Sequence, residues 1–233
     1  MDKRPLSPAQ EDYLRAIYNL LQEHPGEAVS AAALVERMGA PPATVTETVK
    51  RLAVVGLVNH APYRGVTLTL AGEKAALEVI RHHRLLEQYL AEALGLPWDE
   101  VHAEADRLEH VLSEGLEARI AAALGHPTTD PHGDPIPAAD LTVAVASRER
   151  LSDLPAGVGA IVTRVSDQEP PKLRYLAELG LVPGAVIEVL SKAPFDGPLR
   201  LRIGGQEQTV AHELARTIFI GPATNGAERL GGD

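Results

Sequence analysis

Hydrophobic residues at the start of the chain recur at the spacing of an amphipathic helix. Ser7, Pro8 and Gln10 form a capping-box pattern with proline at the first helical position, which marks where this helix begins. Apolar residues then follow every three or four positions, at Tyr13, Leu14, Ile17, Leu20 and Leu21. The pattern predicts a helix that buries one face.

Two shorter helices and a hairpin are predicted next. "SAAALVERMG" begins with an N-cap serine and ends at Gly39, and "PATVTETVKRLAVVGL" supplies a second helix that ends near Gly56. Two short helices joined by a tight Pro-Pro turn form a helix-turn-helix. "LVNHA" and "GVTLTL" are short β-branched or apolar runs on either side of a Pro62–Gly65 turn, which predicts a β-hairpin wing.

The rest of the chain changes character twice. From about Thr69 to Leu124 apolar residues keep helical spacing, with one break at "GLPWD". "GHPTTDPHGDPIP" is too rich in proline, glycine and aspartate for a helix or strand, and indicates an ordered loop. Beyond it, "AIVTRV", "AVIEVL", "LRLRI" and "TIFI" are strand-like and "PKLRYLAELGL" is helical, which predicts a small β-barrel.

Composition narrows the possible chemistry. No run in the chain approaches the ~20 apolar residues of a membrane span, and "MDKRPLSPAQ" lacks the apolar region of a signal peptide, so we expect a cytoplasmic protein with no membrane partner. Because there is no cysteine, a metal must be bound by imidazole, carboxylate, carbonyl or water, which favours hard cations such as Mn(II). The acid excess behind the net charge of −10 lies after residue 75, so the first third can still contact DNA.

One helix-length segment, "VHAEADRLEH", carries a face that can hold metal. His102, Asp106, Glu109 and His110 fall on an arc of about 100° at the α-helical step. Asp106, Glu109 and His110 lie within about 6 Å of axial rise and can share one ion. His102 and His110 are about 12 Å apart and cannot, so the spacing suggests two sites.

A second helix offers partners for this face. In "RHHRLLEQYL", His83 and Glu87 stand at i and i+4 and are neighbours on one side of the helix. Any one of these residues can equally be a solvated charge, since lone Glu, Asp and His are mostly exposed. Together they favour metal ligation. His82 points about 100° away from His83, and His126 and His132 are expected to be polar loop residues.

The second helix of a helix-turn-helix lies in the major groove with its first turns facing base edges. The residues in those positions are Pro42, Ala43, Thr44, Thr46 and Glu47. Lys50 and Arg51 one turn later, and Arg64 in the wing turn, are expected to pair with phosphates. Winged helices also serve as protein-binding modules, and between the two we favour DNA.

Six segments of the chain stand in the same order and at compatible spacings as in a known family: "EDYLRAIY", "TVTETVKRL", "YRGVTLT", "HRLLEQYL", "VHAEADRLEHVLS" and "PHGDPIP". They resemble the diphtheria toxin repressor family of metal-dependent transcriptional regulators, and more closely its manganese-sensing branch. The last part of the chain, from "GVGAIVTRV" to "ARTIFI", is similar to the SH3-like domain that this family shares with the FeoA domain of ferrous-iron transport.

The resemblance implies a fold that is mainly α with a β C-terminal domain. Residues 1–72 would form a winged helix-turn-helix DNA-binding domain, 73–142 a helical metal-binding and dimerisation domain, and 148–223 an SH3-like domain. It also implies a homodimer that binds a palindromic operator in double-stranded DNA and represses genes of metal uptake. We expect no enzymatic activity.

Two sets of metal ligands are implied by the same resemblance. The regulatory set is Asp12 on the first helix together with Asp106, Glu109 and His110. The second set is His83, Glu87 and His102. Full-length members add a ligand from the SH3-like domain, for which Glu169 in "SDQEPPK" is the candidate by spacing, with Asp167 and Gln168 beside it.

Three positions bear on which metal is bound: the two ligand positions Asp12 and Asp106, and Arg15 beside them. Iron-sensing members usually have methionine and cysteine in place of Asp12 and Asp106, so two carboxylates favour Mn(II) by ligand type. Manganese sensors tend to have a glutamate where this chain has Arg15, which argues against a closely spaced two-manganese cluster. An Fe(II)-responsive regulator of the same architecture stays open, as does a carboxylate-bridged metalloenzyme, although no constellation of Ser, Cys or Lys adjoins these helices.

Overall fold

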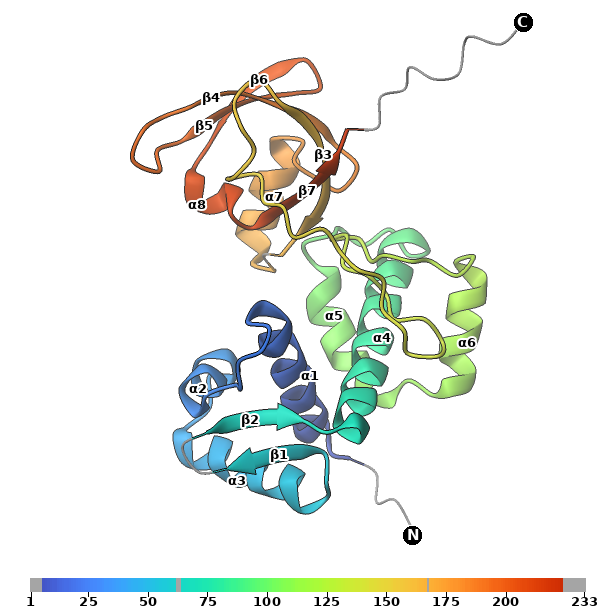
Figure 1. The fold of residues 1–233 in the computed structure, drawn as a ribbon. Helices are drawn as coiled ribbons and strands as arrows, with labels where there is room; N and C mark the ends of the chain where they lie inside the picture. Colours follow the sequence, from blue (N-terminus) through green and yellow to red (C-terminus); the bar gives the residue numbers. More distant parts are fainter. Residues whose placement is uncertain (1–5, 62–63, 167, 224–233) are drawn as a thin grey trace, which may run out of the picture. The chain divides into compact units, whose positions relative to one another are not determined.

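The computed structural model describes residues 6–61, 64–166 and 168–223 (Figure 1). The chain divides into two compact units. The first unit comprises the chain up to His83, with Asp106–Arg119 and Pro137–Val143. The second comprises Arg84–Ala105, Ile120–Ile136 and the chain from Ala144 onward. Helices α4 (Leu70–Glu92), α5 (Val101–Leu108) and α6 (Glu114–Ala123) contribute residues to both units.

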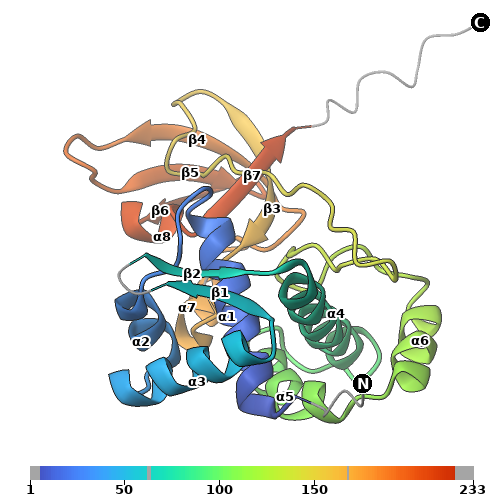
Figure 2. The same ribbon diagram turned by 60° about the horizontal axis from the view of Figure 1, so that its bottom comes forward.

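The first unit begins with a winged helix-turn-helix. Its helices are α1 (Pro8–Glu23), α2 (Ala31–Met38) and α3 (Pro42–Val54), followed by the antiparallel strands β1 (Val58–Ala61) and β2 (Gly65–Leu68). Figures 1 and 2 show β1 and β2 side by side, with α3 next to β1. The predicted helices and hairpin are therefore confirmed.

Local sequence explains where these helices begin and end. The Ser7 hydroxyl accepts from the backbone N–H of Gln10, and the Gln10 side chain accepts from the backbone N–H of Ser7, so the capping box is formed. Ser30 caps α2, and Gly39 ends it with φ +58°, a left-handed conformation that glycine adopts without strain. The apolar faces meet in one core built from Leu14, Ile17, Leu34, Val45, Val49, Leu52, Val58 and Val66.

Gly72 brings the first turn of α4 close to the winged helix. A Cβ atom at this position would lie 1.8 Å from the carbonyl oxygen of Leu57, so only glycine permits the contact. The hydroxyl of Thr69 also donates to the Gly56 carbonyl at 2.8 Å. The direction in which α4 leaves the wing is therefore set by the contacts of Gly72 and Thr69 with the backbone of Leu57 and Gly56.

The segment predicted as one helix from Val101 onward is not continuous, so that prediction is wrong in part. Helix α5 ends at Leu108, and η1 (Glu109–Val111) is a turn of 3₁₀-helix. Leu112 is extended, with ψ +122°, and Ser113 precedes α6. Glu109 and His110 thus lie on a tighter turn than the α-helix from which their spacing was calculated.

The second unit contains a five-stranded antiparallel sheet in the order β6-β5-β4-β3-β7. The strands are β3 (Gly159–Val165), β4 (Val186–Lys192), β5 (Leu199–Ile203), β6 (Gln206–Val210) and β7 (Ile218–Pro222), with helices α7 (Pro170–Glu178) and α8 (His212–Ala215). Its core is apolar and includes Val162, Leu173, Leu176, Val189, Leu201 and Ile220, with Trp98 packed against it. The predicted strands are present, whereas β6 and α8 were not predicted.

The loop predicted over residues 125–137 is ordered and packs onto strand β3. The backbone N–H of Val165 donates to the carbonyl of His132 at 2.8 Å. Gly133 has φ +87°, and a Cβ there would lie 2.0 Å from the carbonyl oxygen of Thr163. Arg164 donates to Asp134 at 3.1 Å. Glycine at position 133 therefore allows the loop to lie directly against the sheet.

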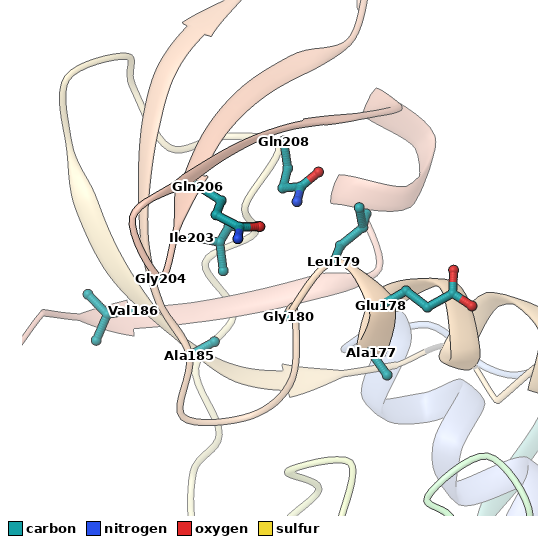
Figure 3. A pocket seen from close by; sticks show the side chains of 10 residues that line it. All are labelled: Ala177, Glu178, Leu179, Gly180, Ala185, Val186, Ile203, Gly204, Gln206 and Gln208. Carbon is teal, nitrogen blue, oxygen red and sulfur yellow. The ribbon is translucent and has the colours of Figure 1, made fainter.

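An open pocket of about 450 Å³ lies between α7 and the β5–β6 hairpin (Figure 3). Its lining includes the side chains of Glu178, Leu179, Ile203, Gln206 and Gln208. Because Glu178 is the single carboxylate in this lining and no histidine joins it, the pocket does not provide a set of metal ligands.

Among the described residues, no helix combines the length and the apolar character needed to cross a bilayer.

Candidate metal centres and DNA-facing surface

Three of the four residues predicted for the regulatory site come together in the first unit. Asp12 lies on α1, and Glu109 and His110 lie on η1. His110 Nε2 is 3.2 Å from Asp12 Oδ1 and 3.4 Å from Glu109 Oε1. Two donors at right angles around an ion with bonds of about 2.1 Å stand about 3 Å apart, so these three atoms have the spacing of a coordination sphere.

Glu109 divides its two carboxylate oxygens between different neighbours. Oε2 is 2.5 Å from His83 Nδ1 and accepts from Arg15 at 3.0 Å. Oε1 is buried and has no hydrogen-bond partner among the described residues. A buried carboxylate oxygen without a partner is costly, and its proximity to Asp12 and His110 fits a ligand that faces a cation.

The imidazole of His110 is oriented by Glu11, a residue that the sequence analysis did not single out. His110 Nδ1 lies 2.6 Å from Glu11 Oε2. Because an ionised carboxylate only accepts, Nδ1 carries the hydrogen, and Nε2 is left with its lone pair toward Asp12 and Glu109. This is the carboxylate–histidine arrangement that commonly supports a metal ligand.

Asp106, the fourth predicted residue, lies beside this group and is bound by Arg15. Both terminal nitrogens of the Arg15 guanidinium donate to Asp106 Oδ1 at 3.0 Å. Arg15 comes from the same helix as Asp12 and is largely buried. The contact between Arg15 and Asp106 joins residues 91 positions apart, so residue spacing along one helix does not predict it.

In this cluster three carboxylates, those of Asp12, Asp106 and Glu109, surround the guanidinium of Arg15. Burial raises the pKa of the Asp12 carboxyl above its ordinary value, although Arg15 and His110 act in the opposite direction. Burial alone would lower the pKa of Arg15, but Glu109 and Asp106 raise it overall, so the guanidinium stays charged. The cluster therefore favours the approach of a further cation at Asp12.

A second cluster, in the second unit, consists of Glu87, Asp130 and His132. Glu87 lies on α4, and the other two lie in the loop that precedes Pro137. Each offers one ligand atom within 4.8 Å of the others, and all three side chains are buried. A buried group of two carboxylates and an imidazole is unusual unless a cation or hydrogen bonds compensate it.

The geometry of His132 leaves one ring nitrogen for a ligand. Its Nε2 is 2.7 Å from the carbonyl oxygen of Trp98, which only accepts, so Nε2 carries the hydrogen. Nδ1 is buried, has no hydrogen-bond partner among the described residues, and lies 3.8 Å from Glu87 Oε2. Trp98 stacks on the same imidazole, with ring centroids 5.6 Å apart. His132 is thus held with an open lone pair toward Glu87.

Asp130 is held by its own loop. One oxygen, Oδ1, accepts from the backbone N–H groups of His132 and Asp134 at 2.9 Å each. Burial raises its pKa well above the ordinary value of 3.8, and Glu87 adds to the rise. Burial alone lowers the pKa of His132, but Glu87 and Asp130 raise it above 6.5 overall. Both pKa values are raised because the carboxylates of Glu87 and Asp130 lie close together in a buried place with too little positive charge around them.

The residues predicted for the second metal site are divided between the two units. His83 belongs to the first and contacts Glu109. Glu87 and His102 belong to the second, where His102 Nδ1 is 2.9 Å from Glu87 Oε1. Glu169 precedes α7, is 67% exposed and pairs with Lys172 at 3.0 Å. Asp167 lies outside the described residues.

His132 lies in the predicted loop, and it was not among the residues predicted to bind metal. Its side chain is fully buried. The signal in the sequence was the run "DPHGD", in which two aspartates flank a histidine and a glycine permits a tight turn. Residue spacing along a helix, which identified the other candidates, has no counterpart in such a loop.

All eight residues predicted to face DNA are exposed. Pro42, Ala43, Thr44, Thr46, Glu47, Lys50 and Arg51 lie on α3, and Arg64 precedes β2. Val45, Val49 and Leu52 on the opposite face of α3 are buried in the core. Arg51 donates to Glu47 at 3.1 Å, so this acidic residue partly neutralises a basic one on the same face.

Known families match three consecutive parts of the chain. Residues 5–66 match the iron dependent repressor N-terminal DNA binding domain, and residues 69–138 match the iron dependent repressor metal binding and dimerisation domain. Residues 149–222 match the FeoA domain. The iron-dependent repressor IdeR of Mycobacterium tuberculosis is 38% identical over 222 residues, which cover 90% of this chain and 95% of the relative.

Other relatives agree along the same length. The diphtheria toxin repressor of Corynebacterium diphtheriae is 32% identical over 227 residues, covering 93% of this chain and 98% of the relative. A solved structure of a manganese-dependent transcriptional repressor in complex with manganese has a TM-score of 0.85 at 40% identity and covers 92% of this chain and 100% of that chain. The manganese regulator SloR has a TM-score of 0.76 at 30% identity, covering 94% and 100%. The predicted fold class is confirmed by these likenesses.

Proposed function

Because the chain belongs to the iron-dependent repressor family of metal-dependent, DNA-binding transcriptional repressors, we propose that the ion to which it responds is Mn(II). The observation that carries this proposal is the donor chemistry of the Asp12, Glu109 and His110 cluster. It offers two carboxylates and one imidazole, and the chain has no cysteine to add a softer ligand. Hard oxygen-rich sites suit Mn(II) by ligand type.

In this proposal Asp12, Glu109, His110 and the neighbouring Asp106 hold the regulatory ion. Glu87, Asp130 and His132 hold a second ion, because all three side chains are buried and each offers one ligand atom within 4.8 Å of the others. The predicted ligands His83, His102 and Glu169 stay predictions. Each cluster contains one buried ligand atom that has no hydrogen-bond partner among the described residues, Oε1 of Glu109 in the first and Nδ1 of His132 in the second. An ion bound in each cluster would interact with that atom.

Asp12 connects the metal to DNA recognition because it lies on α1. The opposite face of α1 carries Leu14 and Ile17, which are fully buried in the same core as Leu52 of α3. A ligand bond between Asp12 and η1 therefore fixes the whole winged helix, including α3, relative to Glu109 and His110. In a homodimer this orientation sets the separation of two recognition helices, and only one separation fits two half-sites of a palindromic operator.

The three predicted segments take distinct roles in this proposal. Residues 1–72 read the operator, residues 73–142 bind metal and form the dimer, and residues 148–223 form the SH3-like domain. Val165 of β3 donates to His132, and Arg164 to Asp134, so the SH3-like domain supports the loop that carries the second cluster. We propose repression of metal-uptake genes as the biological output.

Fluorescence anisotropy tests the proposal. Metal-stripped protein is titrated onto operator fragments taken from upstream of manganese-transport genes, at one fixed salt concentration, with Mn(II) or anaerobic Fe(II) added in parallel. We expect Mn(II) to tighten DNA binding by at least about tenfold, within the usual range of an allosteric coupling. Measured ion binding without any tightening would contradict the metal-switch mechanism.

Fe(II) is the second candidate effector, and the iron-dependent relatives favour it. The two ions are distinguished by the same titration and by one double variant, Asp12→Met with Asp106→Cys. If ligand hardness sets the preference, the variant should shift toward Fe(II) relative to the native protein. An unchanged preference would show that these two residues do not determine it.

A further inference from the structure

Arg15 places its guanidinium among side chains that have the chemistry of metal ligands. Its Nη1 atom lies 2.9 Å from His83 Nδ1, 3.0 Å from Asp106 Oδ1 and 3.0 Å from Glu109 Oε2. Its Nη2 atom also lies 3.6 Å from Asp12 Oδ1. The side chain is 19% exposed, so this cation is held inside the protein.

One nitrogen atom is therefore about equally far from three donor atoms, which is the position an ion would take among them. A divalent ion binds such donors at about 2.0–2.2 Å. An ion at that point would overlap Nη1, because it would lie within bonding distance of the same three atoms that already surround the nitrogen. The guanidinium and an ion at His83, Asp106 and Glu109 exclude each other.

The two carboxylate oxygens of Glu109 face two different groups of atoms. Its Oε2 faces Arg15 and His83, whereas its buried Oε1 faces His110 and Asp12 and has no hydrogen-bond partner among the described residues. One position is filled by a side chain of the protein. The other is the set of atoms proposed above to hold the regulatory ion.

The charges of the cluster agree with this division. Asp12, Asp106 and Glu109 are three carboxylates around one guanidinium, and Glu11 lies against the neutral His110, so these groups carry three net negative charges. One divalent cation compensates two of them. A second divalent cation beside Arg15 would instead add like charges in a partly buried site, which is unfavourable.

We propose that Arg15 determines the metal stoichiometry of this site by occupying its second cation position, so that the cluster takes a single divalent ion. This inference rests on the proposed function, because it concerns how the regulatory site is filled. It also assigns Arg15 a structural role: the guanidinium joins α1 to Asp106 of α5 and to Glu109 of η1 whether or not an ion is bound.

Counting bound Mn(II) by equilibrium dialysis tests the proposal with three variants. Arg15→Gln removes the guanidinium charge and should bind an additional ion per protomer compared with the native protein. Arg15→Lys keeps a cation and should bind the native number. Arg81→Gln removes another buried guanidinium, one that pairs with Glu117, and should also bind the native number. Any second-site ion contributes equally to all four proteins and cancels in the comparison.

Electron paramagnetic resonance on the native protein gives a test that does not depend on how a variant folds. Two Mn(II) ions that share Glu109 would be exchange-coupled, whereas a single ion gives the hyperfine-split signal of an isolated centre. We expect only isolated signals at saturation. A coupled pair in the native protein, or an Arg15→Gln protein that folds and binds the native number of ions, would overturn the inference. Native protein that binds no Mn(II) at all would instead contradict the proposed function.

Discussion

Glu11 and His110 are joined by a 2.6 Å contact between Oε2 and Nδ1 that links helix α1 to η1. The contact determines which nitrogen of His110 carries the hydrogen, and so directs Nε2 toward Asp12 and Glu109. Glu11 is not itself a proposed ligand, but it lies on the same helix as the proposed ligand Asp12.

Replacement of Glu11 should weaken metal binding without removing a ligand. Glu11→Ala is expected to lower Mn(II) affinity at the regulatory site by about 10–100-fold, the usual effect of losing a carboxylate that orients a ligating histidine. Glu11→Gln keeps an acceptor oxygen for Nδ1 and should lose much less. Isothermal titration calorimetry measures both; equal losses in the two variants would show that charge, and not orientation, is what Glu11 contributes.

Asp130→Asn should stabilise the metal-free protein and reduce its stabilisation by Mn(II). The pKa of Asp130 is raised above 3.8. The stability that its protonated form contributes is therefore complete below 3.8 and is lost as pH rises through the higher folded value. Asparagine stays neutral and can accept the same two backbone hydrogen bonds. At neutral pH the variant's melting temperature should be a few degrees higher without metal, since about 1 kcal/mol shifts it by about 2–4 °C.

Asp196→Asn is the matched control for that comparison. Asp196 is 88% exposed and has φ +54°, a conformation that asparagine tolerates. The melting temperature of the Asp196→Asn variant should equal that of the native protein, both in the absence and in the presence of Mn(II). A metal-free Asp130→Asn protein less stable than the native one at neutral pH would show that the carboxylate is compensated by its neighbours.

The fluorescence of Trp98 should report metal binding at the second cluster. Trp98 is the single tryptophan of the chain and stacks on His132. Mn(II) is paramagnetic, so binding at Glu87, Asp130 and His132 should quench its fluorescence. His132→Ala should abolish most of the quenching. His126→Asn, at an exposed histidine of the same loop whose φ of +58° asparagine tolerates, should leave it intact. Quenching that survives in His132→Ala would place the ion elsewhere.

The same signal should depend on pH in a defined direction. A ligating imidazole must be neutral, and the pKa of His132 is raised above 6.5 in the metal-free protein because Glu87 and Asp130 outweigh burial. Protons therefore compete with the ion, and Mn(II) affinity at this cluster should rise as pH increases through 6.5 and continue to rise until the raised value is passed. Affinity that falls over this range would contradict a role for His132 Nδ1.

Glu47→Gln should strengthen non-specific DNA binding. Glu47 and Arg51 form an exposed pair on α3, and such pairs contribute about 0–1 kcal/mol, so the helix should tolerate the change. Without the carboxylate, Arg51 is available to a phosphate, and the slope of log affinity against log salt should steepen by about one. Glu36→Gln on α2, also exposed, is the control that removes the same charge away from the recognition helix.

Lys50→Ala should have the opposite effect. Lys50 is exposed one turn beyond the residues predicted to face base edges. Loss of a phosphate contact should weaken binding about equally for operator and random DNA and reduce the salt slope by about one. A change confined to the operator would instead indicate that Lys50 reads a base.

Prediction from sequence worked well where the chain repeats a pattern. Tyr13, Leu14, Ile17 and Leu20 recur at helical spacing, and all four are buried as that spacing requires. It failed at strand β6, because "QEQTV" carries mostly polar residues and pairs only with β5 at an edge of the sheet. An edge strand needs little apolar surface, so its sequence resembles that of a loop.

The helical face used to predict the metal ligands shows a second kind of failure. Glu109 and His110 were placed on one α-helix with His102 and Asp106, whereas the structure ends that helix at Leu108 and continues as a 3₁₀ turn. The division of the ligands into two sets, which this spacing suggested, stays a prediction. Which oxygen of Glu109 faces which neighbour, and which nitrogen of His110 is free, depends on Arg15 and Glu11 and cannot be calculated from periodicity.

Local sequence was sufficient to predict the helix-turn-helix, its wing, the change to a β domain and the types of ligand available to a metal. These follow from local periodicity, capping residues and composition, which depend on neighbours within a few positions. Tertiary structure decided that His132 and Asp130 of a loop meet Glu87 of a helix, and that Arg15 fills the space between His83, Asp106 and Glu109. Those contacts join residues far apart in the chain, and only packing brings their atoms within a few ångströms.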